Sequence, residues 1–433
     1  MADQKQLEVA NLGARRVRSP LPMSTEAEDG VGDFVADDER VLHDICFRAG
    51  SRPTDLAFER AGAREHIFFE PSETRAAIVT SGGLCPGLNN VTRTLYFELK
   101  MNYGIREVLG IRYGYKGMQP NTSDPPLVLT SELVGDIQHQ GGTILGTSRC
   151  AHDAAHSVDF LVENKIDILF CVGGDGTQRG AHTIAEEVAR RKLAISIVGI
   201  PKTIDNDVKY CDRTFGYFTA VAEADTVIDR AHVEACSVPN GVGLVKLMGR
   251  EAGFIAAGAT IASGEVNFAL IPEVPFELEG PSGLLAKLER RLAAKHHAVI
   301  VVAEGAGQNL LERHEEAFDA SGNRRLGDIG TFLKQEIVAH FKRRDAHVDV
   351  KYFDPSYHIR SCPASTVDSL LCEQFARNAA HAAMAGKTDI LIGTIHNQFV
   401  HVPLPASIGQ AKRLSPESDW WTAVTAITGQ EKW

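Results

Sequence analysis

A carboxylate stands inside a glycine-rich segment, Gly173–Gly180 (GGDGTQRG), directly after an apolar run. Glycines let the backbone approach an anion closely, and Asp175 offers hard oxygen ligands suited to a Mg²⁺ ion that bridges phosphate oxygens. The alternative is that Asp175 only caps the helix that follows. Because the segment is dense in glycine and follows a strand-like run, we expect a loop that binds a nucleotide and a metal ion.

A second glycine-rich turn, Ser81-Gly82-Gly83, also lies between an apolar run and a helix-like stretch. The free N–H groups at the start of a helix bind anions, and glycine removes the side chain that would keep a phosphate away. A plain tight turn would have the same composition. This turn therefore indicates phosphate binding only together with other motifs.

Two carboxylates stand two residues apart in the segment 201–207 (PKTIDND), beside Lys202 and Thr203. A hydroxyl that attacks phosphorus needs a nearby base to take its proton, and Asp205 or Asp207 can provide it. A neighbouring lysine would hold such a base in its ionised form. A surface turn is the alternative, because Asn and Asp favour turns. The position one strand after the GGDGT segment favours a catalytic loop.

A third group of candidates carries arginines that suit phosphate. Arg250 follows the apolar run 242–247 as part of Met248-Gly249-Arg250, and its planar guanidinium matches phosphate geometry. A lone arginine more often forms a surface ion pair. The weaker candidates are Arg149, Glu304, Tyr357 and Arg360.

The elements that must position these residues begin at residue 75. Short apolar runs rich in β-branched residues occupy 76–80, 166–172, 194–200, 242–247 and 298–303. Such runs are typical of buried parallel strands, and helix-like stretches lie between them. This alternation predicts an α/β fold with doubly wound parallel sheets, in which ligands bind where strands end. The motifs stand at those ends.

The composition excludes several classes of protein. The chain has 433 residues and a net charge of 45 − 56 = −11, which argues against broad binding to nucleic acid or anionic membranes. Its eight cysteines are scattered without a CxxC pair, which fits reduced thiols and a cytoplasmic location. We see no signal peptide and no apolar stretch of the ~18–20 residues that a membrane span needs.

In this order, the motifs SGGxxPGLN, GGDGT, PKTIDND and MGRxxG resemble those of the 6-phosphofructokinase family, over about residues 75–405. GGDGT alone also resembles the nucleotide loop of NAD kinases and lipid kinases. TIDND followed by MGR is specific. The resemblance implies two Rossmann-like domains and transfer of a phosphoryl group from ATP, with Mg²⁺, to the 1-hydroxyl of fructose 6-phosphate.

The resemblance also implies a role for each matched residue. Asp205 would be the catalytic base, with Lys202 and Arg149 stabilising the transferring group. Asp175 would bind Mg²⁺. The implied ATP-binding positions are Gly82, Gly83, Arg149, Gly174, Asp175, Gly176, Thr177 and Gly180. The implied sugar-phosphate positions are Thr203, Asp205, Asp207, Met248, Gly249, Arg250, Glu304, Tyr357 and Arg360.

Two departures from the family pattern matter. Short bacterial members carry an arginine, nine residues before the MGR arginine, that reaches across a subunit interface, and here that position is Gly241. Members that use pyrophosphate usually have Asp after GGD and Lys before TIDND, whereas this chain combines Gly176 with Lys202. A carboxylate at 176 would repel an α-phosphate. We therefore expect ATP, and pyrophosphate is the alternative.

The expected organisation follows the family. Residues 1–74 are a partly mobile N-terminal extension, and 75–240 form the nucleotide-binding domain with the catalytic loop. Residues 241–405 form the sugar-phosphate domain. Residues 406–433 form a C-terminal tail that could return to pack on the first domain. We expect a homodimer or homotetramer. The competing hypotheses are an NAD or lipid kinase and an inactive sugar-phosphate sensor, and the latter is disfavoured because Asp175 and Asp205 are both present.

Overall fold

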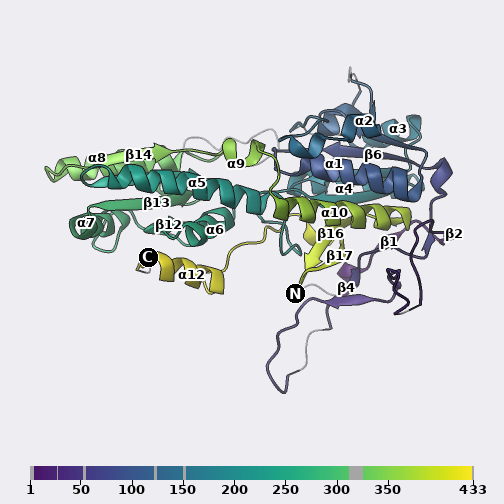
Figure 1. The fold of residues 1–433 in the computed structure, drawn as a ribbon, viewed down its shortest axis with the longest axis horizontal. Coiled ribbons are helices and arrows are strands. Elements are labelled where there is room, and N and C mark those ends of the chain that lie inside the picture. Colours follow the sequence, from purple (N-terminus) through teal and green to yellow (C-terminus); the bar gives the residue numbers. More distant parts are fainter. Residues whose placement is uncertain are drawn as a thin grey trace. The chain divides into compact units, whose positions relative to one another are not determined.

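The computed structural model describes residues 4–26, 28–51, 55–120, 124–149, 153–311 and 325–431 (Figure 1). The chain divides into two compact units. The first comprises residues 1–203, 208–216 and 362–410, and the second comprises 204–207, 217–361 and 411–433. Within the described residues, none of the helices combines the length and apolarity needed to cross a bilayer.

The first unit is built on a nine-stranded sheet in the order β3-β4-β17-β16-β10-β9-β6-β7-β8. The strands from β16 to β7 are parallel, and the strands on either side of them pair antiparallel. In this order the bounds are Arg40–Leu42, Ala57–Arg60, Gln398–Pro403, Ile390–Ile395, Ser196–Pro201, Ile168–Gly173, Arg75–Thr80, Glu107–Ile111 and Leu127–Val128. The central strands β16, β10 and β9 are buried along their whole length, and the apolar runs predicted this for β10 and β9.

Helices of the first unit pack in pairs. Helix α1 (Leu88–Phe97) packs on α10 (Thr366–Met384), and α3 (Ala154–Glu163) packs on α4 (Asp175–Arg190). Both α10 and α4 contact β10, one of the five parallel strands. The remaining elements are η1 (Gln4–Leu7), β1 (Ala10–Asn11), β2 (Val17–Arg18), β5 (His66–Ile67), η2 (Pro71–Glu73), η3 (Glu98–Tyr103), η4 (Gly114–Met118), α2 (Ser131–Val134), η5 (Ile137–His139), β15 (Lys387–Thr388) and α11 (Leu404–Ser407).

The second unit holds a parallel sheet in the order β12-β13-β11-β14, with bounds Phe268–Leu270, His297–Ala303, Gly241–Leu247 and Asp349–Phe353. Val242, Leu244 and Ile300 face a core shared with α7 (Leu284–Lys295) and α8 (Ile329–Arg343). On the other face, a side chain at Gly243 would collide with Ala231 of α5 (Tyr217–Cys236). The other elements are α6 (Phe254–Ser263), η6 (Gln308–Leu310), α9 (His358–Ser361) and α12 (Asp419–Thr428).

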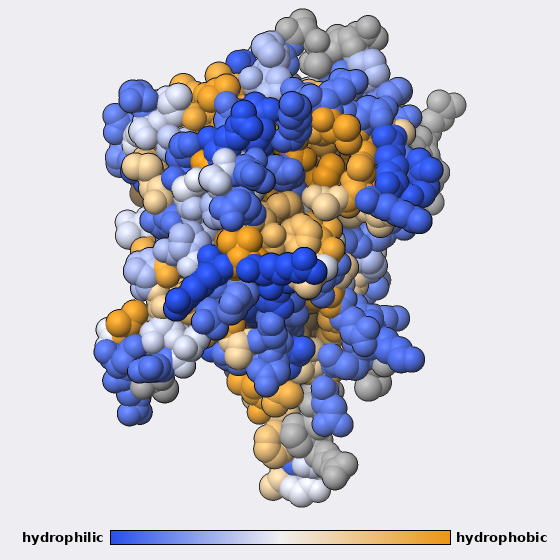
Figure 2. Space-filling view, turned by 90° about the vertical axis from the view of Figure 1, so that its right-hand side faces the viewer, coloured by the Kyte–Doolittle hydropathy of each residue, from blue (hydrophilic) through white to orange (hydrophobic). Residues whose placement is uncertain are grey.

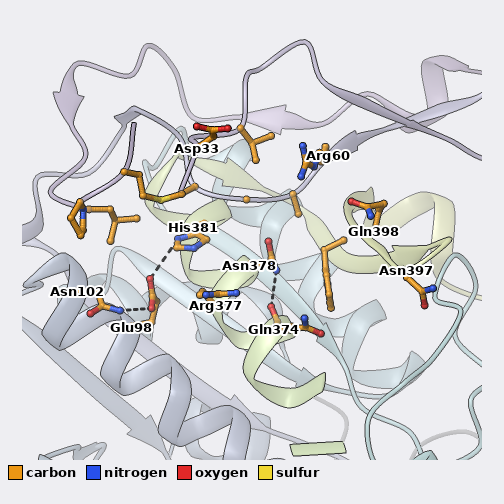
Figure 3. A pocket seen from close by; sticks show the side chains of 18 residues that line it. Asp33, Arg60, Glu98, Asn102, Gln374, Arg377, Asn378, His381, Asn397 and Gln398 are labelled. Atoms are coloured by element: carbon orange, nitrogen blue, oxygen red, sulfur yellow. Dashed lines mark hydrogen bonds and ion pairs between the residues drawn. The ribbon is translucent and has the colours of Figure 1, made fainter. Parts of the chain in front are cut away.

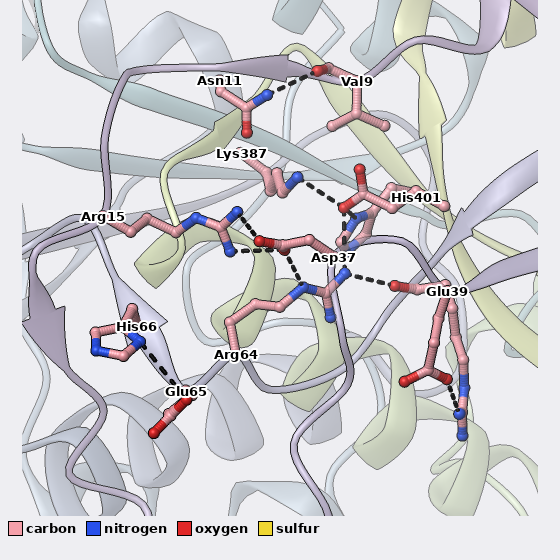
Figure 4. A network of polar contacts seen from close by, with 12 residues as sticks. Val9, Asn11, Arg15, Asp37, Glu39, Arg64, Glu65, His66, Lys387 and His401 are labelled. Atoms are coloured by element: carbon pink, nitrogen blue, oxygen red, sulfur yellow. Dashed lines mark hydrogen bonds and ion pairs between the residues drawn. The ribbon is translucent and has the colours of Figure 1, made fainter. Parts of the chain in front are cut away.

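The N-terminal extension contributes strands to the first unit. β4 pairs with β17 and β3 with β4, so the extension lengthens the central sheet at one edge. Glu59 of β4 is buried, and its carboxylate lies 2.7 Å from Lys387, 3.0 Å from His401 and 3.2 Å from Arg64. Figure 4 labels these three partners. Burial alone would raise the pKa of Glu59, but His401 and Lys387 hold it well below its usual range.

The observed boundaries differ from the expected ranges at the C-terminal end. Residues 362–410 belong to the first unit because β16 pairs with β10 and β17 pairs with β16. The described tail, 411–431, lies with the second unit, not the first. There α12 packs on α6, and the N–H of Ala269 donates a hydrogen bond to the Gln430 side chain at 2.8 Å.

Candidate active site

Three parallel strands of the first unit end side by side where the predicted loops begin. β6 pairs with β9 as far as Thr80 and Val172, and β9 pairs with β10 as far as Gly173 and Pro201. The turn after β6, the GGDGT loop and Lys202 therefore share one edge of the sheet. Doubly wound sheets bind their ligands at this edge.

Lys202 connects two of these loops. Its side chain is buried, and its Nζ donates a hydrogen bond to the Gly83 carbonyl at 2.7 Å. Its backbone N–H donates to the carbonyl of Gly173 at 3.0 Å. Gly82 has a φ of +89°, and a Cβ there would lie 3.2 Å from the ammonium nitrogen. The fold thus places a cation beside a glycine turn, an arrangement that suits a transferring phosphoryl group.

The GGDGT loop turns directly into helix α4. A Cβ at Gly173 would lie 2.1 Å from the Thr177 hydroxyl, so the close packing of this side chain requires glycine. The Tyr115 hydroxyl fixes the turn by donating to the Thr177 carbonyl at 2.7 Å. The first N–H groups of α4 have no partner within the helix and form a natural anion site. Gly180 is buried in the second turn of α4.

Asp175 is accessible at the start of α4. Its side chain is 47% exposed, pairs with Arg179 at 3.0 Å and accepts a hydrogen bond from the Gly409 N–H at 2.8 Å. A Cβ at the neighbouring Gly176 would meet no heavy atom within 4 Å. The fold therefore does not require glycine there, and the space beside Asp175 fits a nucleotide with its metal ion.

Arg149 follows a segment that is fastened to the turn after β6. The Gly82 N–H donates to the Ser148 carbonyl at 3.1 Å, and the Thr147 hydroxyl donates to the Gly82 carbonyl at 2.6 Å. Arg149 itself is exposed. These hydrogen bonds place the backbone next to Arg149 at the same ends of the parallel strands where Lys202 lies.

The chain passes from the first unit to the second within the TIDND loop. The Thr203 carbonyl accepts a hydrogen bond from the Thr214 hydroxyl at 2.7 Å, within the first unit. Asp205 and Asp207 belong to the second unit, where the Asp207 carbonyl accepts from the Lys412 N–H at 2.7 Å. Thr203, Asp205 and Asp207 are all partly buried.

In the second unit, the predicted sugar-phosphate residues meet where β11 and β13 end. The two strands pair as far as Leu247 and Ala303, so the segment Met248–Arg250 and Glu304 begin at one edge. The Gly305 N–H donates to the Gly249 carbonyl at 3.0 Å. Gly249 has a φ of +128°, which a larger residue rarely adopts.

Glu304 lies among cations. Burial raises the pKa of its carboxyl, and the positive charges of Arg250, Lys246 and Arg360 oppose that shift. The Arg360 guanidinium stacks 4.7 Å from the centroid of the Tyr357 ring, and Tyr357 is largely exposed. A half-buried carboxylate with three cations near it suits an anionic ligand that also carries hydroxyl groups.

Known proteins resemble this chain over most of its length. Residues 75–383 match the family model described as Phosphofructokinase. An ATP-dependent 6-phosphofructokinase of Borreliella burgdorferi is 43% identical over 430 residues, which cover 98% of this chain and 96% of that protein. ATP-dependent 6-phosphofructokinase 7 of Arabidopsis thaliana is 48% identical over 399 residues, 92% of this chain and 81% of the relative. This chain belongs to the phosphofructokinase family.

The phosphofructokinase fold agrees with solved structures. The crystal structure of a pyrophosphate-dependent phosphofructokinase from Marinobacter aquaeolei has a TM-score of 0.65 and 20% identity, over 82% of this chain and 91% of that one. At this identity the likeness concerns the fold alone. The predicted family and the predicted α/β class, with its parallel sheets, are confirmed.

Sequence reasoning missed one cation of the second unit. Lys246 pairs with Asp354 at 2.8 Å and Asp328 at 3.2 Å, and its charge acts on Glu304. The available signal was a lysine inside the otherwise apolar strand 241–247.

Gly241 has a structural reason to differ from the arginine of the short bacterial members, since a Cβ there would lie 2.1 Å from the Ala235 carbonyl oxygen.

A separate cavity of about 470 Å³ lies in the first unit (Figure 3). It is lined by the N-terminal extension, η3, α10 and the beginning of β17, with Arg60, Arg377 and His381 among its polar residues. None of the predicted site residues lines it. It is therefore distinct from the strand edges described above.

Proposed function

We propose that this chain is an ATP-dependent 6-phosphofructokinase. It transfers the γ-phosphoryl group of ATP to the 1-hydroxyl of D-fructose 6-phosphate and yields fructose 1,6-bisphosphate and ADP, a step of glycolysis. The observation that carries this proposal is the near full-length similarity to proteins named ATP-dependent 6-phosphofructokinase, together with intact GGDGT, TIDND and MGR motifs.

The open space at Gly176 supports ATP as the donor. Since the fold does not need glycine at this position, the absence of a side chain is best explained by a ligand that uses the space. An aspartate there would place a negative charge beside the nucleotide phosphates. Lys202, the lysine before TIDND, is the position at which this chain resembles members that use pyrophosphate, so pyrophosphate is the alternative donor to test.

Asp175 is the residue that would hold Mg²⁺. The exposed carboxylate offers hard oxygen ligands, and the metal would neutralise charge on the ATP phosphates. The first N–H groups of α4, with Gly174, Gly176, Thr177 and Gly180, would cradle the nucleotide. Gly82, Gly83, Lys202 and Arg149 would stabilise the charge that develops on the transferring group.

In the sugar site, Arg250 and Arg360 would bind the 6-phosphate and Glu304 would accept hydrogen bonds from the sugar hydroxyls. Thr203, Asp207, Met248, Gly249 and Tyr357 would complete this site. Asp205 would take the proton of the attacking 1-hydroxyl, a contribution of about 10²–10⁴ in rate. Asp205 stands three positions after Lys202, so the covalent chain alone limits their Cα separation to about 11 Å.

We further propose that the enzyme is a cytoplasmic homodimer or homotetramer. On the face shown in Figure 2, hydrophobic residues gather at several places among hydrophilic ones. Exposed large apolar side chains of the N-terminal extension include Ile45 and Phe47. Burial of such side chains against another copy would remove them from water.

One assay tests the proposed reaction. The purified full chain receives fructose 6-phosphate and Mg²⁺ with ATP in one reaction and pyrophosphate in another, and fructose 1,6-bisphosphate is measured through coupling enzymes. We expect turnover with ATP that stops when EDTA removes the metal. Turnover only with pyrophosphate would reassign the donor. Activity only on NAD or diacylglycerol as acceptors would refute the proposal.

A further inference from the structure

A cluster of metal-binding side chains lies in the second unit, away from the predicted sugar site. One ring nitrogen each of His232 and His297 and the Sγ of Cys236 lie within 4.8 Å of one another. His232 and Cys236 stand four residues apart near the end of α5, so they share one face of that helix. His297 is the first residue of β13. Two sequence-distant elements thus bring their ligand atoms together.

The hydrogen bonds of the two imidazoles fix which nitrogen of each ring can act as a ligand. His297 Nδ1 lies 3.0 Å from the Lys295 carbonyl, which can only accept, so this nitrogen must donate. His232 Nδ1 lies 3.1 Å from a carboxylate oxygen of Glu265. In both rings the proton is thereby assigned to Nδ1, and Nε2 keeps its lone pair in the neutral form. Metal-binding histidines show this pattern, with the second nitrogen donating to a carboxylate or carbonyl.

We propose that His232, Cys236 and His297 form a binding site for a transition-metal dication, with Zn²⁺ as the best match. Two imidazoles and a thiolate suit Zn²⁺, whereas Mg²⁺ and Ca²⁺ prefer oxygen ligands. With Zn–N near 2.0 Å and Zn–S near 2.3 Å, a tetrahedral site needs donor atoms about 3.3–3.6 Å apart. Modest side-chain rotation closes the present spacing, and the exposed Cys236 has room to rotate. A solvent molecule completes the fourth position.

The site is positioned to act on the fold of the second unit and not on the reaction. His297 and Glu304 stand at opposite ends of β13, seven residues apart, which corresponds to about 23 Å along a strand. The metal would link the end of α5 to the beginning of the central strand β13. Arg291 already fixes this point, because its Nε donates to the His297 carbonyl at 3.3 Å.

The test is a titration of the reduced full chain, freed of metal, with Zn²⁺ by calorimetry and with Co²⁺ by absorption spectroscopy. We expect one equivalent per chain, insensitivity to excess Mg²⁺, and a Co²⁺ spectrum with tetrahedral d–d bands and a thiolate charge-transfer band. Zn²⁺ should also raise the Tm by several degrees, since a ligand of the native state stabilises it.

The variants separate this site from adventitious binding. Cys236→Ser and His297→Asn should each weaken Zn²⁺ binding by more than about 100-fold, and Glu265→Gln by about 10–100-fold. Cys46→Ser and His347→Asn, at exposed positions elsewhere, should leave binding unchanged. Cys236→Ser should abolish the charge-transfer band while circular dichroism stays native. Zn²⁺ affinity that is unchanged by His297→Asn, or absence of a stoichiometric site, would overturn the proposal whatever the enzyme assay shows.

Discussion

The buried lysine of the first unit illustrates how single residues are placed by this fold. Lys202 follows strand β10, its backbone N–H donates to the Gly173 carbonyl at the end of β9, and its ammonium group reaches the turn that follows β6. Sequence spacing predicted that this lysine belongs to a catalytic loop. The contact with the Gly83 carbonyl required the structure, because it depends on the order of strands in the sheet.

Replacing this lysine tests its proposed role. Lys202→Met should lower kcat by about 10²–10³, the range seen when a preorganised donor to a developing negative charge is lost. The KM for fructose 6-phosphate should change little. Steady-state kinetics, with the exposed Lys342→Met as the control, give both parameters. A kcat within threefold of the parent would remove Lys202 from the reaction.

Gly176→Asp tests the choice of donor at one residue. The added side chain meets open space, so the Tm should remain within about 2 °C of the parent. Repulsion between the carboxylate and the nucleotide phosphates should lower kcat/KM for ATP by about 100-fold or more. Kinetics with ATP and pyrophosphate measure the effect. Unchanged use of ATP would show that the open space serves another purpose.

Residue-level prediction from sequence succeeded unevenly. The glycines, Lys202 and Asp175 carry recognisable motifs. Lys246 does not, because a lysine in an apolar strand has no short-range signature, and its partners Asp328 and Asp354 lie 82 and 108 positions further along the chain. The roles assigned to the site residues stay predictions until variants are measured.

At the scale of elements, the pairing of β4 with β17 joins the N-terminal extension to the central sheet, and a buried ion cluster accompanies it. Glu59 of β4 is the shared partner of Lys387, His401 and Arg64. Removing the Glu59 carboxylate would leave the buried positive charges of Lys387 and Arg64 without this counter-charge.

Glu59→Gln should therefore lower the free energy of unfolding by about 3–5 kcal/mol. Glu39→Gln, which removes an exposed ion pair with Arg60, should cost about 1 kcal/mol or less. Urea unfolding at neutral pH compares the two variants. Equal losses would contradict the structural importance of the buried cluster.

A second element-scale prediction concerns pH. Burial raises the pKa of Asp389, before β16, from 3.8 to about 6, although His182 of α4 lies 2.9 Å away and opposes the shift. The folded chain therefore holds this proton more tightly than the unfolded chain, so the contribution of Asp389 to stability falls as pH rises from about 4 to 6.

Asp389→Asn should gain stability relative to the parent over the same pH range, by up to about 3 kcal/mol. Asparagine also tolerates the positive φ of 54° at this position. Urea unfolding of both proteins at pH 4.5 and pH 7.5 provides the comparison. Parallel stability profiles would show that the carboxyl titrates near its ordinary value.

The strand pattern explains how much of the fold the sequence could reveal. The apolar runs at 76–80, 166–172, 194–200, 242–247 and 298–303 correspond to β6, β9, β10, β11 and β13. The segment 390–395 was not recognised as a strand, although it is equally apolar. It pairs with β10, nearly 200 residues earlier in the chain, and no local sequence signal indicates such a distant pairing. The expected boundary at residue 405 therefore differs from the observed units.

At the scale of the whole molecule, the proposed assembly makes a simple prediction. Light scattering coupled to size-exclusion chromatography should give two or four times the 47.0 kDa mass of the chain. The double variant Ile45→Ser and Phe47→Ser should shift the protein toward smaller species if the N-terminal extension contributes to the interface. A parent protein that is monomeric at micromolar concentration would contradict the proposed assembly.

The central claim is that the chain transfers a phosphoryl group to fructose 6-phosphate with Asp205 as the base. The most direct measurement is the turnover of Asp205→Ser with ATP, Mg²⁺ and fructose 6-phosphate, beside calorimetric binding of the sugar phosphate and the exposed control Asp44→Ser. We predict a kcat lowered by about 10²–10⁴ with nearly unchanged sugar binding. A kcat close to that of the parent would contradict the account.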